Sequence, residues 1–373
     1  MKLNWEVAMN EGRSGWRKCL LGEIITLQRG FDITQKDQKV GKYPVVSSSG
    51  IKSWHNEWKV KGPGIVIGRK GTLGTVFYLP DQFWPHDTTL WIKHFHGNFP
   101  RFIYYFLTGF EFARYDVGSS NPTLNRNHVH LVPAYLPPLS EQKAIAAVLS
   151  SLDDKIDLLH RQNKTLESMA ETLFRQWFIE EAQEEWKERP LSSIADFLNG
   201  LACQKYPPQN EIEKLPVLKI KELSSGITEL SDWAMSKVKP EYIVEFGDVI
   251  FAWSASLMVK VWDGERCVLN QHLFKVTSAD FPKWFYLLWC KYHLAEFISI
   301  SSAHATTMGH IKRGDLDAAM VIVPSEPELR EMSMIMTPLL EKQIANAKQI
   351  KLLQNLRDVL LPKLMSGEAR VIY

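Results

Sequence analysis

The sequence predicts an α/β (α+β) chain in which two similar lobes alternate with two long helices. Three observations lead to this expectation. The two halves of the chain align with each other in order, each half contains short β-rich runs separated by glycine and proline, and each half ends in a long segment with helical spacing of its apolar residues. The chain has 373 residues, 45% of them hydrophobic, which is enough for two ordinary cores.

The repeat rests on seven matches that keep their order along the chain. The separation between matched positions grows slowly from 170 to 187 residues, and one insertion of roughly a dozen residues, between Gly30 and Gly64, explains most of the growth. Chance recurrence of short apolar motifs is the alternative, which seven ordered matches disfavour. The matched pairs are Trp16 with Trp186, Gly30 with Gly200, 64–67 with 247–250, 99–101 with 281–283, Thr123 with Thr307, Pro138 with Pro324, and 173–174 with 360–361.

Each lobe is expected to hold a mixed sheet followed by a helix. Short β-rich runs such as residues 65–67 and 249–251 predict strands. Residues 100–108 and 282–297 predict helices, and the proline that opens each segment suits a first helical turn.

The first long helix is predicted by a strict 4-3 repeat, with no glycine or proline between residues 139 and 189. Such spacing is typical of a coiled-coil seam, in which Asn163 would specify the register at some cost in stability. A second, less regular helix reaches Gly367, with Pro338 expected at a start or kink. We expect the two helices to pair, and a four-helix-bundle fragment is the alternative. The first seam consists of Ile145, Leu149, Leu152, Ile156, Leu159, Asn163, Leu166, Ala170, Leu173 and Trp177.

The charge is distributed unevenly between the lobes. Residues 16–138 contain 15 basic and 8 acidic residues (15 − 8 = +7), which fits a polyanionic partner, whereas residues 187–324 contain 15 and 16 (15 − 16 = −1). The four scattered cysteines predict free thiols rather than a zinc or redox site. We find neither a secretory signal nor a long apolar run, so no membrane association and a cytoplasmic location are expected.

Motifs for catalysis are missing from the sequence. Gly68 is followed by Arg69 and not by the lysine of a phosphate-binding loop. The four-residue motif of amino-methyltransferases, Asp/Asn-Pro-Pro followed by an aromatic residue, is also missing. So is the common nuclease signature of a Pro-Asp pair followed by acidic-x-Lys. His94 and His96 have no third metal ligand nearby in sequence. We therefore assign no catalytic residue and no metal ligand.

Four features together resemble the specificity subunits of type I restriction-modification systems. One is the lobe-to-helix junction at residues 137–143, Pro-Pro-Leu-Ser-Glu-Gln-Lys. The others are Leu-Phe-Arg-Gln-Trp-Phe at 173–178, Arg-Asp-Val-Leu-Leu-Pro-Lys-Leu at 357–364 before Gly367-Glu368, and the alternation of lobe and helix. The second junction, residues 324–328, lacks the Pro-Pro and Glu-Gln pairs and so departs from the pattern.

The resemblance implies a non-catalytic subunit with two target-recognition domains, residues 1–138 and 187–324. Each would read one half of a bipartite site in double-stranded DNA. Spacers 139–186 and 325–373 would pair as an antiparallel coiled coil and relate the lobes by a pseudo-twofold axis. Two modification subunits would bring adenine methylation with S-adenosylmethionine, and restriction subunits would add an ATP- and Mg²⁺-dependent nuclease.

Polar clusters in turn-rich segments are the candidate DNA contacts, because amides, guanidinium groups and hydroxyls can reach base edges and phosphates. Ordinary turn chemistry is an equal alternative for each segment. In the first lobe the candidates are Ser47, Ser48, Ser49, Arg69, Lys70, His86, Asp87, Thr88, Asn121, Thr123, Asn125 and Arg126. In the second lobe they are Trp253, Ser254, Ser256, Asn270, Gln271, His272, Thr306, Thr307, His310, Lys312 and Arg313.

A partner surface is expected at the end of the first long helix, where Phe174, Trp177 and Phe178 add more apolar bulk than one seam needs. Packing of these side chains inside the chain is the alternative. Two other functions stay open from sequence: a stand-alone DNA methyltransferase or nuclease, and a coiled-coil adaptor that does not bind DNA.

Overall fold

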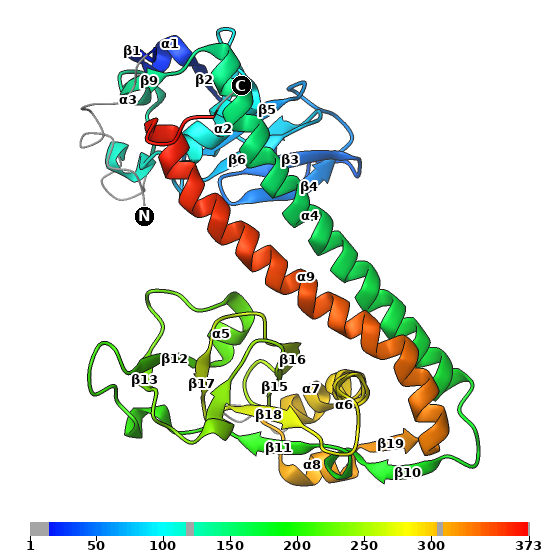
Figure 1. Ribbon diagram of the computed structural model, residues 1–373. Coiled ribbons are helices and arrows are strands. Elements are labelled where there is room, and N and C mark those ends of the chain that lie inside the picture. The colour runs from blue at the N-terminus through cyan, green and yellow to red at the C-terminus, as the bar shows by residue number, and fades with distance from the viewer. Residues whose placement is uncertain (1–14, 117–122, 304–308, 372–373) are drawn as a thin grey trace. The chain divides into compact units, whose positions relative to one another are not determined.

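The computed structural model describes residues 15–116, 123–303 and 309–371, and its chain divides into two units (Figure 1). The first unit consists of residues 1–157 and 352–373, and the second of residues 158–351. Helix α4 (Leu139–Arg175) and helix α9 (Glu326–Ser366) each contribute one part to each unit.

The first lobe is built on two sheets. The larger one is wholly antiparallel, so the mixed sheet expected from sequence is found only in the smaller one. The main sheet has the order β2 (Thr26–Arg29), β8 (Thr89–His94), β5 (Gly64–Gly68), β6 (Val76–Leu79), and the second has the order β4 (Gly50–His55), β3 (Tyr43–Ser47), β7 (Trp84–Pro85). A separate pair joins β1 (Arg17–Leu20) to β9 (Pro133–Leu136). The helices are α1 (Leu21–Ile24), α2 (Pro100–Thr108) and α3 (Arg126–His130), with a 3-10 turn at Phe112–Tyr115.

The core of the first unit lies between this sheet, α2 and the ends of the long helices. Every residue of the central strand β5 is buried, as its run of β-branched residues predicts. Helix α2 has the bounds that the sequence predicted, and Phe102 and Phe106 stack on its inner side at 5.8 Å between ring centroids. Ile145 and Leu149 of α4 complete the same core.

The second lobe repeats this architecture. Its sheets have the orders β11 (Asp196–Asn199), β18 (Leu273–Thr277), β15 (Val249–Ala252), β16 (Met258–Val261) and β13 (Trp233–Met235), β12 (Lys214–Leu218), β17 (Cys267–Leu269), β14 (Ile243–Val244). A further pair joins β10 (Lys187–Pro190) to β19 (Met320–Val323). The helices are α5 (Ile220–Ser225), α6 (Lys283–Tyr292), α7 (Leu294–Ala303) and α8 (Arg313–Ala318), with 3-10 turns at Leu191–Ser193, Cys203–Lys205 and Pro240–Tyr242.

Two of these helices correct a sequence prediction. The segment 282–297, expected as one helix, is divided between α6 and α7. The break falls at His293, whose ring stacks on Trp289 and donates through Nε2 to the carbonyl of Met320, 2.9 Å away. Tertiary contacts of one buried side chain therefore decide where the first helix ends.

Equivalent side chains hold each lobe to its helix. Trp16 Nε1 donates to Glu141 at the start of α4, at 3.1 Å, and Trp186 Nε1 donates to Glu328 at the start of α9, at 3.0 Å. Both acceptors lie in the first helical turn, where the helix dipole favours a carboxylate. The match of Trp16 with Trp186 made from sequence is thereby confirmed.

The predicted seam positions of α4 are buried or half-buried, whereas most of its other residues are exposed. In the second unit, Asn163 Nδ2 donates to the Gln343 carbonyl of α9 at 3.1 Å, and Asn163 Oδ1 accepts from Asn346 Nδ2 at 2.9 Å. In the first unit, Arg357 of α9 pairs with Asp153 of α4 at 3.0 Å. Helix α4 continues into one π-helical turn, Gln176–Glu180.

Helix α9 is longer than its prolines suggested. It runs through Pro338 and Pro362 and ends just before Gly367, which has a φ of +76° that favours glycine at a helix end. The prediction that a helix could start at Pro338 is therefore wrong, because α9 begins at Glu326.

All four cysteines are buried free thiols. Among the described residues, none of the helices combines the length and the apolar character needed to traverse a lipid bilayer.

Candidate nucleic-acid interface

The candidate site of the first lobe forms where strands β2, β5 and β7 end. Gly30 lies so close to the turn after β7 that a Cβ there would meet the His86 carbonyl oxygen at 2.1 Å. Gly30 N donates to the Thr89 carbonyl, and Arg69 N donates to that of Thr88, at 3.0 and 2.9 Å. The backbone thus fixes the ends of three strands against one turn.

The charged side chains of this turn bind one another. Arg29 Nη2 donates to Asp87 Oδ2 at 2.8 Å, and His86 Nδ1 lies 3.1 Å from Asp87 Oδ1. Arg69 donates through Nε and Nη2 to the backbone carbonyl of Asp87, at 3.4 and 3.3 Å. Thr88 contacts the His86 ring at 3.0 Å. These residues come from three segments far apart in sequence.

The electrostatics of the cluster favour an ionised carboxylate. Burial raises the pKa of Asp87, but the hydrogen bond from Arg29 and the charges of His86 and Arg69 outweigh it, so the pKa lies below its usual value. Burial, together with the charge of Arg29, lowers the pKa of Arg69. Two guanidinium charges therefore lie near one carboxylate charge, and Arg29 forms the ion pair with it while Arg69 bonds the backbone.

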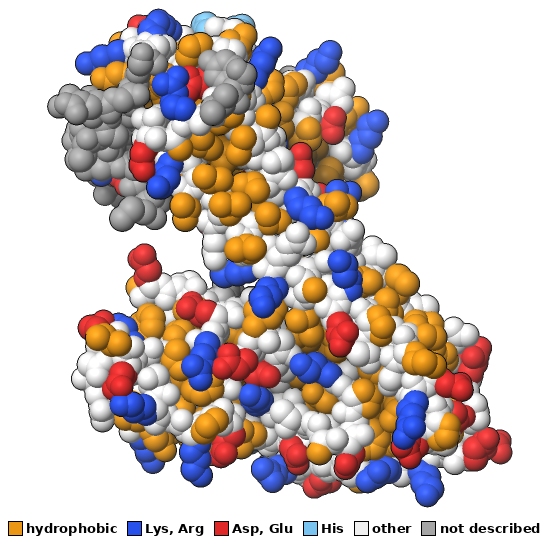
Figure 2. All heavy atoms as spheres, viewed as in Figure 1, with side chains coloured by type: hydrophobic (Ala, Val, Ile, Leu, Met, Phe, Trp, Pro, Cys, Tyr) orange, Lys and Arg blue, Asp and Glu red, His pale blue; other side chains and the backbone are white. Residues whose placement is uncertain are grey.

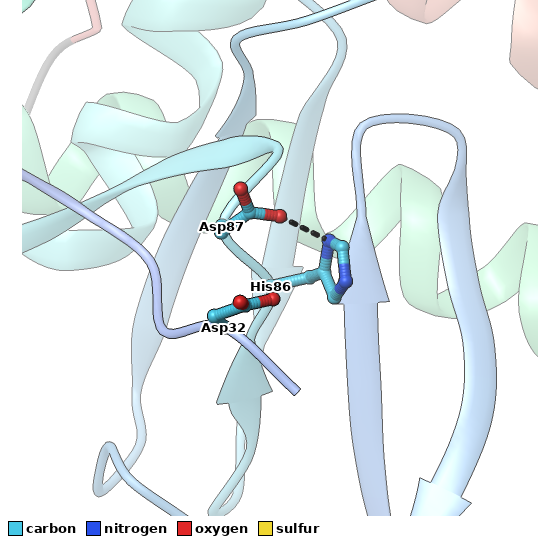
Figure 3. Close-up of side chains that lie close together, drawn as sticks. All are labelled: Asp32, His86 and Asp87. Atoms are coloured by element: carbon cyan, nitrogen blue, oxygen red, sulfur yellow. Dashed lines mark ion pairs between the residues drawn. The ribbon is translucent and has the colours of Figure 1, made fainter. Parts of the chain in front are cut away.

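Asp32, His86 and Asp87 also place three potential metal-ligand atoms within 4.8 Å of one another (Figure 3). Asp87 is already engaged through both oxygens, by Arg29 and by His86. A cation there would have to displace an existing partner, so we assign no metal to this group.

The candidate site of the second lobe is built around an aromatic side chain. Trp253 stacks on Phe274 at 5.6 Å, and its Nε1 donates to Asn199 Oδ1 at 3.2 Å. His272 lies 5.9 Å from the Trp253 ring, and its Nδ1 contacts the Ser254 hydroxyl at 3.2 Å. On the face of the second unit drawn in Figure 2, basic and acidic side chains are interspersed.

Backbone bridges relate the two sites position by position. An antiparallel bridge joins Lys70 to Thr123, and the corresponding bridge joins Ser254 to His310. Thr123 therefore corresponds to His310 and not to Thr307, which corrects the sequence alignment by three residues.

A second pair of bridges relates the turns. Phe31 bridges His86 in parallel, and Leu201 bridges Asn270 in parallel. Gly200, like Gly30, leaves no room for a Cβ, which would meet the Asn270 carbonyl oxygen at 2.3 Å. Positions 86–88 of the first lobe thus correspond to 270–272 of the second, and position 29 corresponds to 199. One backbone framework presents two different sets of side chains.

The family described as type I restriction modification DNA specificity domain matches the chain twice, over residues 13–168 and 183–354. The chain belongs to this family. The MjaIX type I specificity subunit from Methanocaldococcus jannaschii is 29% identical over 304 residues, which is 74% of this chain and 70% of that relative. The EcoprrI specificity subunit from Escherichia coli is 26% identical over 145 residues, 37% of this chain and 36% of that relative.

The fold is similar to that of the S subunit of a type I restriction-modification system from M. genitalium. The TM-score is 0.64 at 14% identity, over 96% of this chain and 98% of that chain. These findings confirm the family resemblance and the two mixed lobes predicted from sequence. Two copies of a DNA specificity domain make DNA target recognition the function of this family member.

The candidate residues of this DNA specificity chain fall into four groups, the last of which serves local structure. Arg69, Lys70, His86, Asp87, Thr88, Thr123, Trp253, Ser254, Gln271, His272 and His310 gather at the two strand-end sites. Ser49, Arg126, Ser256, Lys312 and Arg313 are exposed. Asn121, Thr306 and Thr307 lie outside the described residues.

Some candidates serve local structure instead. Ser47 and Ser48 are buried; Ser47 donates to the Gly50 carbonyl at 3.0 Å. Asn270 is 3% exposed, and its side chain accepts from the backbone of His272. Asn125 accepts from the backbone of Asn127 as the N-cap of α3. For Ser47, Ser48, Asn270 and also Ser254, which is 5% exposed, burial corrects the expectation of a direct base contact.

Sequence reasoning missed Arg29 and Asn199. Each precedes the glycine that the repeat alignment had matched, Gly30 or Gly200, and each is exposed at the end of a strand. A polar residue directly before a repeated strand-end glycine was the available signal.

The predicted partner surface at the end of α4 needs correction. Phe174 and Phe178 are 5% and 1% exposed and belong to the core of the second lobe, against Trp289. Trp177 is half-buried and packs on the same core. The extra apolar bulk seen in the sequence thus anchors helix α4 to its own lobe.

Proposed function

We propose that each lobe reads one half of a bipartite site in double-stranded DNA, and that the chain supplies recognition without catalysis. The observation that carries this is the repeated strand-end framework with different side chains in the two lobes. A shared framework with divergent polar groups is what two readers of unlike sequences require.

The lobes are residues 1–138 and 187–324, and the spacers are residues 139–186 and 325–373. We infer that the spacers form an antiparallel coiled coil that relates the lobes by a pseudo-twofold axis. Support comes from contacts within each unit: Asp153 meets Arg357, and Asn163 meets Asn346, so residue numbers rise along α4 as they fall along α9.

Two modification subunits dock on the helices in this proposal. They supply S-adenosylmethionine-dependent adenine methylation, and restriction subunits add the ATP- and Mg²⁺-dependent nuclease. The candidate docking surface is an apolar stripe on α9, formed by Leu352, Leu356 and Val359, which are 67%, 44% and 56% exposed. Their spacing places them on one side of the helix.

DNA binding by the purified full-length chain is the first test. The first lobe carries the basic excess, so affinity should fall with salt with a log–log slope of about −0.9 for each phosphate contacted. A coiled-coil adaptor without DNA affinity would give no binding at any salt concentration, and that result would overturn the proposal.

Catalysis is tested separately. The chain alone, incubated with S-adenosylmethionine and DNA, should transfer no methyl group, whereas a preparation from the native host should contain a co-purifying methyltransferase. Methyl transfer or cleavage by the chain without partners would instead favour a stand-alone enzyme.

A further inference from the structure

Arg29 is held in a defined position at the end of β2. The following residue, Gly30, is wedged against the His86 carbonyl, and Phe31 N donates to the Pro85 carbonyl at 2.8 Å. The backbone that carries Arg29 is therefore fixed against the turn that carries Asp87. Fixing that backbone removes one part of the conformational entropy that the segment would otherwise lose on binding a ligand.

The Arg29 side chain is oriented by a single carboxylate. Asp87 accepts from its Nη2 at 2.8 Å and is itself held by His86 at 3.1 Å. The Asp87 side chain is 19% exposed, whereas that of Arg29 is 56% exposed. Among the described residues, Arg29 donates to one acceptor, Asp87. Most of the five N–H donors of the Arg29 guanidinium therefore face solvent.

We propose that Arg29 reads a guanine in the half-site bound by the first lobe, with Asp87 as its positioning residue. This rests on the proposed function. A guanidinium with free parallel donors matches the O6 and N7 acceptors of guanine in the major groove, and this bidentate pair is the commonest specific contact of arginine with DNA.

The equivalent position in the second lobe has different chemistry. Asn199 stands there, and its Oδ1 accepts from Trp253 Nε1 at 3.2 Å. An amide cannot form the two-donor pair with guanine that a guanidinium forms. The two lobes therefore differ at a corresponding reading position, and the guanine preference belongs to one half-site.

Two other roles of Arg29 make different predictions. A phosphate contact would strengthen binding to all sequences equally. A purely structural ion pair on the surface would contribute little to stability and nothing to sequence preference.

The test compares full-length wild type with Arg29→Ala and Arg29→Lys on a randomised duplex library, followed by sequencing of the bound DNA and competition binding. Wild type should enrich a G·C pair at one position of one half-site. Arg29→Ala should lose about 10- to 100-fold of that preference and leave the other half-site unchanged. Arg29→Lys keeps the charge but not the paired donors, so it should lose the preference while keeping the salt slope.

Asp87→Ala tests the positioning role. Removing this negative charge should raise affinity for unrelated DNA, while the freed Arg29 should discriminate guanine less well. A merely structural role would lower binding to every sequence together, in proportion to the fraction of unfolded protein measured by circular dichroism.

The outcomes separate the two levels of inference. If the wild-type chain enriches no sequence, the proposed function itself fails. If wild type enriches a bipartite site but folded Arg29→Ala and Arg29→Lys keep the same preference, or lose affinity evenly for all DNA, the assignment of Arg29 is overturned and the function stands.

Discussion

Phe178 shows how one side chain can connect a long helix to a lobe. Its ring lies 5.6 Å from those of both Phe285 and Trp289 and 5.7 Å from that of Trp186, and the side chain is 1% exposed. Such edge and tilted contacts between aromatic rings add to the free energy of simple burial. The residue is a structural anchor of the second unit.

Truncation of this anchor should therefore cost stability. Phe178→Ala is expected to lower the free energy of unfolding by about 3–5 kcal/mol, because it removes a large buried side chain and leaves a cavity. The neighbouring Ile179, 42% exposed, provides a matched control. Ile179→Ala should change the free energy of unfolding by less than about 0.5 kcal/mol. Urea unfolding measures both, and equal effects would contradict the assignment.

Asp87 gives the first lobe a pH dependence that can be isolated. Its pKa is depressed, so its contribution to stability is present above the pKa of the unfolded chain and is lost as pH falls through the lower folded value. Between about pH 6 and about pH 3, Asp87→Asn should lose less free energy of unfolding than wild type. Identical pH profiles of the two proteins would show that the ion pair is not stabilising.

At the scale of the elements, one polar contact stands inside the apolar pairing of α4 and α9 in the second unit. Asn346 is 1% exposed and bonds Asn163, which also bonds the backbone carbonyl of Gln343. A buried polar pair of this kind limits which registers of two helices are tolerated, because other registers leave the amides without partners.

A double-mutant cycle tests this role. Asn163→Leu should cost about 1–3 kcal/mol, because the buried Asn346 amide then keeps only its longer bond, to Gln162 at 3.5 Å. Adding Asn346→Leu should recover most of the loss, since neither amide is then buried. Thermal unfolding gives the energies, and simple additivity of the two substitutions would argue against coupling.

The apolar stripe of α9 makes its own prediction. Leu356→Asp should abolish co-purification of a modification subunit from the native host, because it places a charge in the proposed contact. Leu230, 84% exposed in the second lobe, is the matched control, and Leu230→Asp should co-purify normally. Normal assembly of Leu356→Asp would remove the stripe from the docking surface.

At the scale of the whole molecule, the helices are proposed to set the spacing of the two half-sites. Helix α4 has 37 residues, a length of about 55 Å at ~1.5 Å per residue. A heptad inserted between Asn163 and Leu166, with a matching heptad in α9, keeps the apolar positions in phase.

Such a variant adds about 10 Å of helix, comparable to roughly three base pairs of B-DNA. The half-site sequences should stay the same while the unspecified gap between them changes, by fewer than about three base pairs because DNA can bend or twist. Methylome sequencing of cells carrying the variant reports the gap. An active variant with an unchanged gap would mean that the helices do not set the distance between the half-sites.

Local patterns predicted the long helix and α2, because each depends on residues close together in sequence, and the repeat followed from comparing such patterns between the two halves. The burial of Ile145, Leu149 and Leu159 follows directly from their 4-3 spacing. The alignment of Trp16 with Trp186 likewise needed only the order of residues, and the equivalent hydrogen bonds to Glu141 and Glu328 give its physical reason.

The environment of polar and aromatic side chains was decided by tertiary structure. Phe178 and Asn270 were expected at a partner surface and a DNA surface, yet the core and the turn bury both. Arg29 and Asp87 lie 58 residues apart in sequence and meet because Gly30 packs on the turn after β7. By itself the sequence determined the family, the two lobes and the helical periodicity, which are local properties. Which polar groups point outward to read DNA depends on contacts between distant segments, and these exist only in the folded chain.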